Sequence, residues 1–544
     1  MTEDAPRGRI AYDGINTPIK SALFVLVCLA WLLPGLVGHD PWKVDEALVF
    51  GSVSEMLRTG DWVQFRIAGE LFLEKAPLLL WTAAALGKLL GGLLPLHDAA
   101  RLASGVYVAL TLGLLSMASL ELLGERAARM CVLLFIGCVG LLIRAHELTT
   151  DLAGIAGITL ALYGLCLARR KPAAGGAITG AGMGLGFLGD GFLPLAMLLT
   201  LLAMLPLASP QWRNRNYAIT AGVALLCALP VAAIWPLAVV YASPITLGTW
   251  LDSLHAGSTF DGLGVLYYLR ILPWYAWPAW PLAAWTIWRA RRTLADRRDL
   301  QLPIIAFIAF FLTISIFGEA HEVNAMPLLL PLALLGVAEL ESIPRGAASA
   351  LDWFGMTTFF LFGALIWIGW VAAITGQPEF AAAWLQREVP GFTYHFSFVA
   401  FSLAALLTLI WLVVVARSLR STRRALVNWT AGITMLWMLV MTLGVPLVDQ
   451  ARSYRAVSSR IVQALPPDFT CVARRNVGEA QRALLDYFVN LTTIREDHPA
   501  AARCKALLVQ ATPLRIPAAG PEWTENWRGS RPGDRNELFI VYTR

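Results

Sequence analysis

The chain has 544 residues, of which 57% are hydrophobic and only 15% are charged, and its formal net charge is +6. Many apolar runs reach the roughly 20 residues that a membrane-spanning helix needs, which excludes an ordinary soluble domain. The basic residues gather in short clusters between these runs, as the positive-inside rule expects, and not in a nucleic-acid-binding patch. The sequence therefore predicts a polytopic α-helical membrane protein with no nucleic-acid partner.

The first apolar stretch, residues 21–38, predicts a spanning helix. It lacks a small-residue cleavage site and is followed by more apolar runs, so it is not a cleavable signal. Arg7, Arg9 and Lys20 precede it and place the N-terminus in the cytoplasm. We expect the stretch 77–95 to be an interfacial helix on the outer leaflet, because counting it as a span would move the later basic clusters outside.

The rest of the hydrophobic region predicts further spans, about thirteen in all with the first. They cover residues 101–121, 127–145, 151–168, 173–189, 192–208, 217–240, 271–289, 302–318, 326–341, 352–373, 396–416 and 426–446. With this assignment every strong Arg cluster is cytoplasmic. The predicted fold is an all-α polytopic membrane domain, residues 1–446, with additional interfacial helices.

The chain becomes more polar after Pro446. Alternating helical and strand-like runs predict a small α/β domain over residues 447–544, which our topology places in the periplasm. Cys471 and Cys504 are the only cysteines in this tail, and disulfides persist in an oxidising compartment. We predict that they form a disulfide; two buried free thiols are the alternative.

Seven ionisable residues lie on the predicted outer face of the membrane domain. They are Asp45, Glu46, Glu74, Lys75, His146, Glu147 and Asp151. Ionisable groups beside the bilayer are costly and therefore indicate function. A carboxylate here can orient or deprotonate an acceptor hydroxyl, and a lysine can hold a phosphate.

Structural explanations compete with function in this loop. For Asp40, Asp61 and Glu70 we expect ordinary loop solvation. For Asp45 the alternative role is the N-cap of a helix that begins near Glu46, which an aspartate performs well.

Several short motifs resemble a known family. They are an acidic pair soon after the first span, Gly60-Asp61-Trp62, the E-K-x-P-L-x-x-W pattern from Glu74, Thr149-Thr150-Asp151, and the segment Leu266–Trp280. Together they resemble the GT-C membrane glycosyltransferases, in particular the lipid A aminoarabinose transferases and the bacterial protein mannosyltransferase-like proteins. The tail is similar to the periplasmic domain of the aminoarabinose group.

The resemblance implies an enzyme of the bacterial inner membrane that uses a polyprenyl-phosphate-linked sugar. Its acceptor would be lipid A or a related periplasmic-side glycan or lipid. Asp45 and Asp151 would correspond to the family's essential carboxylates, and Lys75 would hold the donor phosphate. Glu46, Glu74, His146 and Glu147 would bind or position substrate. No cofactor is implied with certainty; a divalent cation is an alternative partner for Glu74, although no cluster with metal-ligand spacing accompanies it.

Two departures from the family pattern leave the sugar undetermined. Asp190 stands in GFLGDGF where many relatives carry a lysine, and Glu319, His321 and Glu322 replace a basic residue and a tyrosine. The alternatives are therefore a protein O-glycosyltransferase of the same superfamily and a non-enzymatic transporter or assembly protein for lipid-linked glycans.

Overall fold

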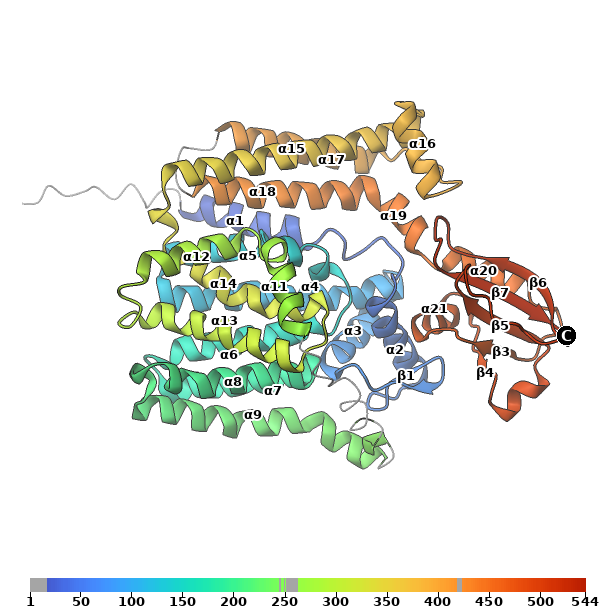
Figure 1. Ribbon diagram of the computed structural model, residues 1–544, viewed down its shortest axis with the longest axis horizontal. Helices are drawn as coiled ribbons and strands as arrows, with labels where there is room; N and C mark the ends of the chain where they lie inside the picture. The colour runs from blue at the N-terminus through green and yellow to red at the C-terminus, as the bar shows by residue number, and fades with distance from the viewer. Residues whose placement is uncertain (1–16, 244–245, 249, 251–262, 418–422) are drawn as a thin grey trace, which may run out of the picture.

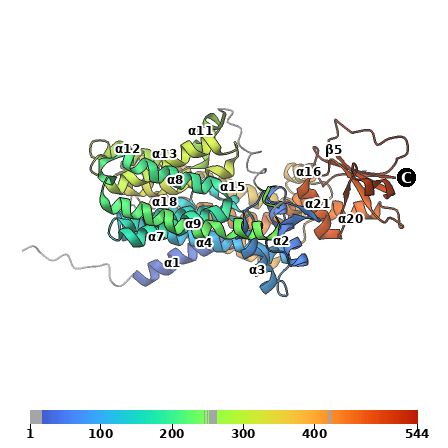
Figure 2. The ribbon, with the colours of Figure 1, turned by 90° about the horizontal axis from the view of Figure 1, so that it is seen from below.

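The computed structural model describes residues 17–243, 246–248, 250, 263–417 and 423–544, so Arg7 and Arg9 lie outside the described residues. A bundle of helices that run roughly side by side forms the larger part of the molecule (Figure 1). A small sheet domain, made by the end of the chain, stands beyond one end of the bundle, with α2 and α3 next to it (Figure 2). The predicted combination of a helical membrane domain and a C-terminal α/β domain is confirmed.

The longer helices form most of the bundle. They are α1 (Thr17–Leu32), α4 (Leu96–Leu123), α6 (Asp151–Ala168), α7 (Pro172–Asp190), α8 (Phe192–Ala208), α9 (Arg215–Ala242), α13 (Arg298–Phe317), α15 (Arg345–Thr375), α17 (Phe398–Arg417) and α18 (Arg424–Leu439).

Shorter helices connect and flank them. They are α2 (Asp45–Thr59), α3 (Pro77–Leu90), α5 (Glu125–Ile136), α11 (Leu263–Tyr275), α12 (Ala279–Ala290), α14 (Met326–Ala338), α16 (Glu379–Glu388) and α19 (Val445–Arg452).

Seven helices in the described part of the chain are long and apolar enough to cross a membrane, or eight if one bent pair counts as a span. Others that we predicted as spans are short: α1 has 16 residues, about 24 Å, against a hydrocarbon core of about 30 Å. The count of thirteen therefore stays a prediction. The helix α3 has 14 residues, which agrees with an interfacial helix better than with a span.

Two of the predicted spans are not single straight helices. Residues 127–145 break after α5 into the turns η1 (Val139–Leu141) and η2 (Arg144–His146), with a bend of 63°. The bend is held from outside the segment, because the carbonyl of Gly137 accepts a hydrogen bond from the indole of Trp429. Residues 271–289 are divided between α11 and α12 before Pro278, which has no N–H to continue a helix.

The tail domain contains a five-stranded mixed sheet in the order β4-β3-β5-β7-β6. Its strands are β3 (Val472–Arg475), β4 (Ile494–Arg495), β5 (Ala506–Ala511), β6 (Thr524–Gly529) and β7 (Leu538–Thr543). The helices α20 (Arg455–Gln463) and α21 (Glu479–Val489) pack an apolar face on this sheet, with Ile461 and Leu484 in the shared core. Helix α19 continues to Arg452, and α20 follows from Arg455. The division of the chain at residue 447 stays a prediction.

The predicted disulfide is present. Cys471 and Cys504 are bonded, with 5.0 Å between their Cα atoms. The bridge ties the start of β3 to the start of β5 and closes a separation of 33 residues. The five other cysteines are free.

Mass mapping should recover this disulfide. In protein purified without reductant, a non-reducing digest is expected to give a linked peptide that contains Cys471 and Cys504. Replacing both with serine should destabilise the tail by about 2 to 4 kcal/mol, because the unfolded chain regains the entropy of an open loop. Alkylation of both thiols without prior reduction would contradict the pairing.

Charged residues of the first loop attach the tail domain to the membrane domain. Asp40 is buried and accepts hydrogen bonds from Arg455 Nε at 3.0 Å and Ser453 Oγ at 2.6 Å. Glu70, at the start of β2 (Glu70–Leu71), pairs with Arg474 at 2.7 Å and Arg482 at 2.9 Å. The prediction of simple loop solvation is therefore wrong for Asp40 and Glu70.

Candidate functional site

Asp45 lies at the centre of the charged residues near the tail domain. It is the first residue of α2, and the N-cap Val44 gives no side-chain cap, so the alternative role of Asp45 as an N-cap is wrong. Its carboxylate instead lies between two cations. Oδ1 is 3.4 Å from Lys75 Nζ, and Oδ2 is 3.6 Å from Arg144. Side-chain exposures of 27% for Asp45 and 22% for Lys75 leave both groups partly accessible.

Lys75 is positioned by the start of α3. Ala76 is extended and Pro77 occupies the first turn of the helix, which fixes the direction of the preceding residue. Burial disfavours the charged ammonium, but the carboxyl groups of Asp151, Asp45 and Asp190 outweigh it and raise the pKa of Lys75. Lys75 therefore stays protonated at neutral pH and can bind an anion.

The close packing of α6 and α7 brings Asp151 and Asp190 together. Glycines make this possible: a Cβ at Gly157 would lie 2.4 Å from the backbone nitrogen of Gly186. Nearer the site, a Cβ at Gly154 would lie 2.6 Å from the Cβ of Asp190. Asp151 starts α6 and Asp190 ends α7, so an antiparallel helix pair places both carboxyl groups at one end.

The packing of α6 and α7, and not a sequence motif, shows that Asp190 lies near Lys75. In the sequence Asp190 was only a departure from the family pattern, whereas in the structure it is one of three carboxyl groups that act on Lys75. The signal that could have found it is the predicted hairpin of adjacent spans 151–168 and 173–189, whose outer ends must meet.

Arg144 is a site residue that the sequence reasoning missed. It is 2.9 Å from Glu147 and 2.9 Å from Glu322, in addition to its contact with Asp45. The bend after α5 turns it toward these acids, and an arginine inside a predicted apolar span was the available signal. Glu322, which begins η4 (Glu322–Ala325), therefore belongs to the cluster; a hydrated loop was the alternative.

The pKa of the Glu147 carboxyl group lies near neutral pH. Burial raises its pKa to about 7, although the neighbouring Arg144 acts in the opposite direction. Both protonation states are accordingly populated near neutrality. A carboxyl group in this range can accept or donate a proton during a reaction.

The structure places the other predicted residues in different surroundings. Glu46 is buried, 2.5 Å from Arg101, and accepts a hydrogen bond from the backbone N–H of Trp42. The ring of His146 is packed against Trp31 and Trp437, with its nitrogens 2.7 and 2.8 Å from backbone carbonyls. These contacts favour structural roles for Glu46 and His146.

Glu74 makes no ion pair with the cluster around Asp45 in the described part of the chain; its electrostatic partner is instead Glu479. The side chain of Glu74 is exposed. Burial and then the charge of Glu74 raise the pKa of Glu479 in the tail domain, on which Glu70 and Arg474 also act. Among the residues that the structure describes, no three His, Cys, Asp or Glu side chains are placed to hold a metal ion. The cluster consequently offers ionic and hydrogen-bonding groups, with Lys75 and Arg144 as its cations.

Comparison with solved structures identifies the fold. The structure of ArnT from Cupriavidus metallidurans bound to undecaprenyl phosphate aligns with a TM-score of 0.70 at 18% identity, covering 96% of this chain and 98% of that one. The chain has the GT-C fold of ArnT. No family model matches the sequence.

Curated relatives with similar sequences are named as aminoarabinose transferases. An undecaprenyl phosphate-alpha-4-amino-4-deoxy-L-arabinose arabinosyl transferase of Pseudomonas aeruginosa (strain UCBPP-PA14) is 28% identical over 82% of this chain and 77% of its own length. A relative of that name numbered 1, from Pseudomonas fluorescens (strain Pf-5), is 27% identical over 61% of this chain and 62% of its own length. The resemblance to the aminoarabinose transferases is confirmed.

Proposed function

We propose that this chain is an inner-membrane glycosyltransferase that moves a sugar from a polyprenyl-phosphate carrier to a periplasmic-side acceptor such as lipid A. The observation that carries the proposal is the placement of Lys75 and Arg144 around Asp45 at one end of an ArnT-like bundle. The names of the relatives, which specify undecaprenyl phosphate and an aminoarabinose transfer, support this donor class.

In this mechanism the donor's lipid tail lies in the bilayer and its phosphate binds Lys75. An acceptor hydroxyl is oriented or deprotonated by Asp45 or Asp151, and its oxygen forms a bond to the anomeric carbon. The bond between that carbon and the phosphate oxygen breaks, and the electron pair leaves with polyprenyl phosphate. The ammonium of Lys75 stabilises the charge that develops on the leaving phosphate.

Arg144 organises the carboxylates around this reaction. Its guanidinium contacts Asp45, Glu147 and Glu322, so it fixes the direction of the Asp45 carboxylate beside Lys75. Where Asp45 or Asp151 only orients the acceptor hydroxyl, Glu147, with its pKa near 7, can take the proton that this hydroxyl releases. In this role Arg144 is a positioning residue.

The arrangement of basic clusters supports a periplasmic site. Helix α6 runs about 27 Å from Asp151 to the basic residues at 169–171, and α7 returns to Asp190. Helix α13 likewise begins beside Arg297 and ends before the loop of Glu322. The positive-inside rule then puts the basic ends in the cytoplasm and the site, with the tail domain, in the periplasm.

Reporter fusions test this orientation. An alkaline phosphatase fused after Arg544 is expected to be active, because it would fold in the oxidising periplasm, whereas one fused after Arg292 should be inactive. The opposite pair of results would place the charged cluster on the cytoplasmic side and overturn the proposed acceptor location.

A transfer assay tests the activity itself. Purified full-length protein, reconstituted with undecaprenyl-phosphate aminoarabinose and lipid A, is expected to transfer the sugar, with the product detected by mass spectrometry. Parallel reactions with envelope protein as acceptor examine the O-glycosyltransferase alternative. Absence of turnover with every lipid-linked sugar tried would favour the non-enzymatic alternative.

A further inference from the structure

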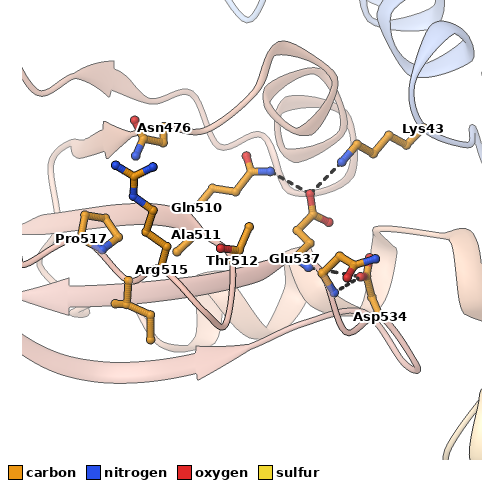
Figure 3. A pocket seen from close by; sticks show the side chains of 11 residues that line it. Lys43, Asn476, Gln510, Ala511, Thr512, Arg515, Pro517, Asp534 and Glu537 are labelled. Carbon is orange, nitrogen blue, oxygen red and sulfur yellow. Dashed lines mark hydrogen bonds and ion pairs between the residues drawn. The ribbon is translucent and has the colours of Figure 1, made fainter.

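A cavity of about 970 Å³ lies where the tail domain meets the loop after α1. Its wall includes Lys43 from that loop and Asn476, Gln510, Thr512, Arg515 and Asn536 from the tail. Figure 3 shows Lys43 on one side with Glu537, and Arg515 on the opposite side next to Asn476. The volume lies within the range of about 300 to 1,000 Å³ that is typical of small-molecule sites.

The acidic groups of this cavity are already neutralised. Glu537 is buried and accepts hydrogen bonds from Lys43 at 3.0 Å, Gln481 at 2.6 Å and Gln510 at 2.8 Å. Asp534 pairs with Arg531, which also approaches Glu537 at 3.5 Å. Two cations therefore balance two carboxylates along this wall.

Arg515 adds a further positive charge to the cavity, beyond the two cations that balance Glu537 and Asp534. Within the described parts of the chain its guanidinium has no hydrogen-bond or ion-pair partner. A turn closed by the Thr512 and Arg515 bridge presents it at the cavity. An unpaired guanidinium that faces a cavity of this size is suited to bind a phosphate or carboxylate through two parallel hydrogen bonds.

We propose that this cavity binds a phosphorylated saccharide, the polar headgroup of the acceptor lipid. Arg515 binds a phosphate, while Asn476, Thr512 and Asn536 offer amide and hydroxyl groups to the sugar hydroxyls. Lys43 is two residues before Asp45, so their Cα atoms are at most about 7.6 Å apart, and one wall of the cavity belongs to the same loop as the reaction site. The inference rests on the proposed function for the identity of the acceptor.

Direct binding tests the cavity without requiring turnover. The probe is a soluble glucosamine disaccharide bisphosphate, titrated by calorimetry into full-length protein in detergent. Arg515→Ala is expected to weaken binding at least tenfold, Arg515→Lys to restore part of the loss, and the unphosphorylated disaccharide to bind at least tenfold more weakly to the wild type. Arg503→Ala, an exposed arginine outside the cavity, is the matched control and should bind normally.

Equal affinity of the wild type and Arg515→Ala, or of the two disaccharides, would overturn the proposal. In the transfer assay Arg515→Ala should raise KM for the acceptor about tenfold and leave kcat and KM for the donor unchanged. Binding through Arg515 without any sugar transfer by the wild type would reject the proposed function but not the cavity. Normal transfer with no effect of Arg515 on binding would reject the cavity alone.

Discussion

Replacing Lys75 with alanine is expected to lower kcat and raise KM for the donor, with a loss of roughly a hundredfold or more in kcat/KM. The ammonium that holds the donor phosphate would be lost, and so would the charge that stabilises its departure. Activity is measured with a polyprenyl-phosphate sugar in folded, membrane-inserted protein. Lys88→Ala is the matched control, because Lys88 is exposed near the other end of the same helix α3.

The substitutions Asp45→Asn and Asp151→Asn are expected to lower kcat, whereas Lys75→Ala should also raise KM for the donor. Asp45→Asn and Asp151→Asn are nearly isosteric, so each variant is expected to fold and to lose roughly a hundredfold in kcat if its carboxylate acts as base or stabilises charge. Asp45→Asn also weakens the contacts with Lys75 and Arg144. Turnover near that of the wild type in Lys75→Ala and in both aspartate variants would reject the site assignment.

Replacing Arg101 with methionine is expected to destabilise the membrane domain by about 3 to 5 kcal/mol. Arg101 is fully buried in α4, where it lies 2.5 Å from Glu46 and 2.8 Å from Asp98 and donates to the carbonyl of His39. Without it, two carboxylates would remain buried with no cation between them. A lower midpoint of thermal unfolding in detergent measures the effect.

Arg126→Met provides the comparison for this substitution, since Arg126 is exposed near the start of α5. It should unfold close to the wild-type temperature. If the midpoint of Arg101→Met were equally unchanged, the buried network around Glu46 would not support the first loop. Because Glu46 is adjacent to Asp45, loss of this support should also reduce transfer.

The sequence by itself determined the properties that depend on local composition. Apolar runs specify helices in a membrane, and the change of composition after Pro446 marks a second domain. The pair Cys471 and Cys504 could be predicted because no other cysteine lies in the tail. Asp45 and Lys75 could be named together through a motif that places them thirty residues apart, and they are in contact.

Only the tertiary structure decided which charges meet. Asp190 acts on Lys75 because glycines let α6 and α7 pack closely. Arg144 contacts Glu322 after the bend that follows α5, where the indole of Trp429 donates a hydrogen bond to the backbone. Hydropathy gives the length of a helix but not where it bends or which side chain faces a partner far along the chain. Contacts between distant segments depend on how the helices pack, and local sequence patterns do not contain that information.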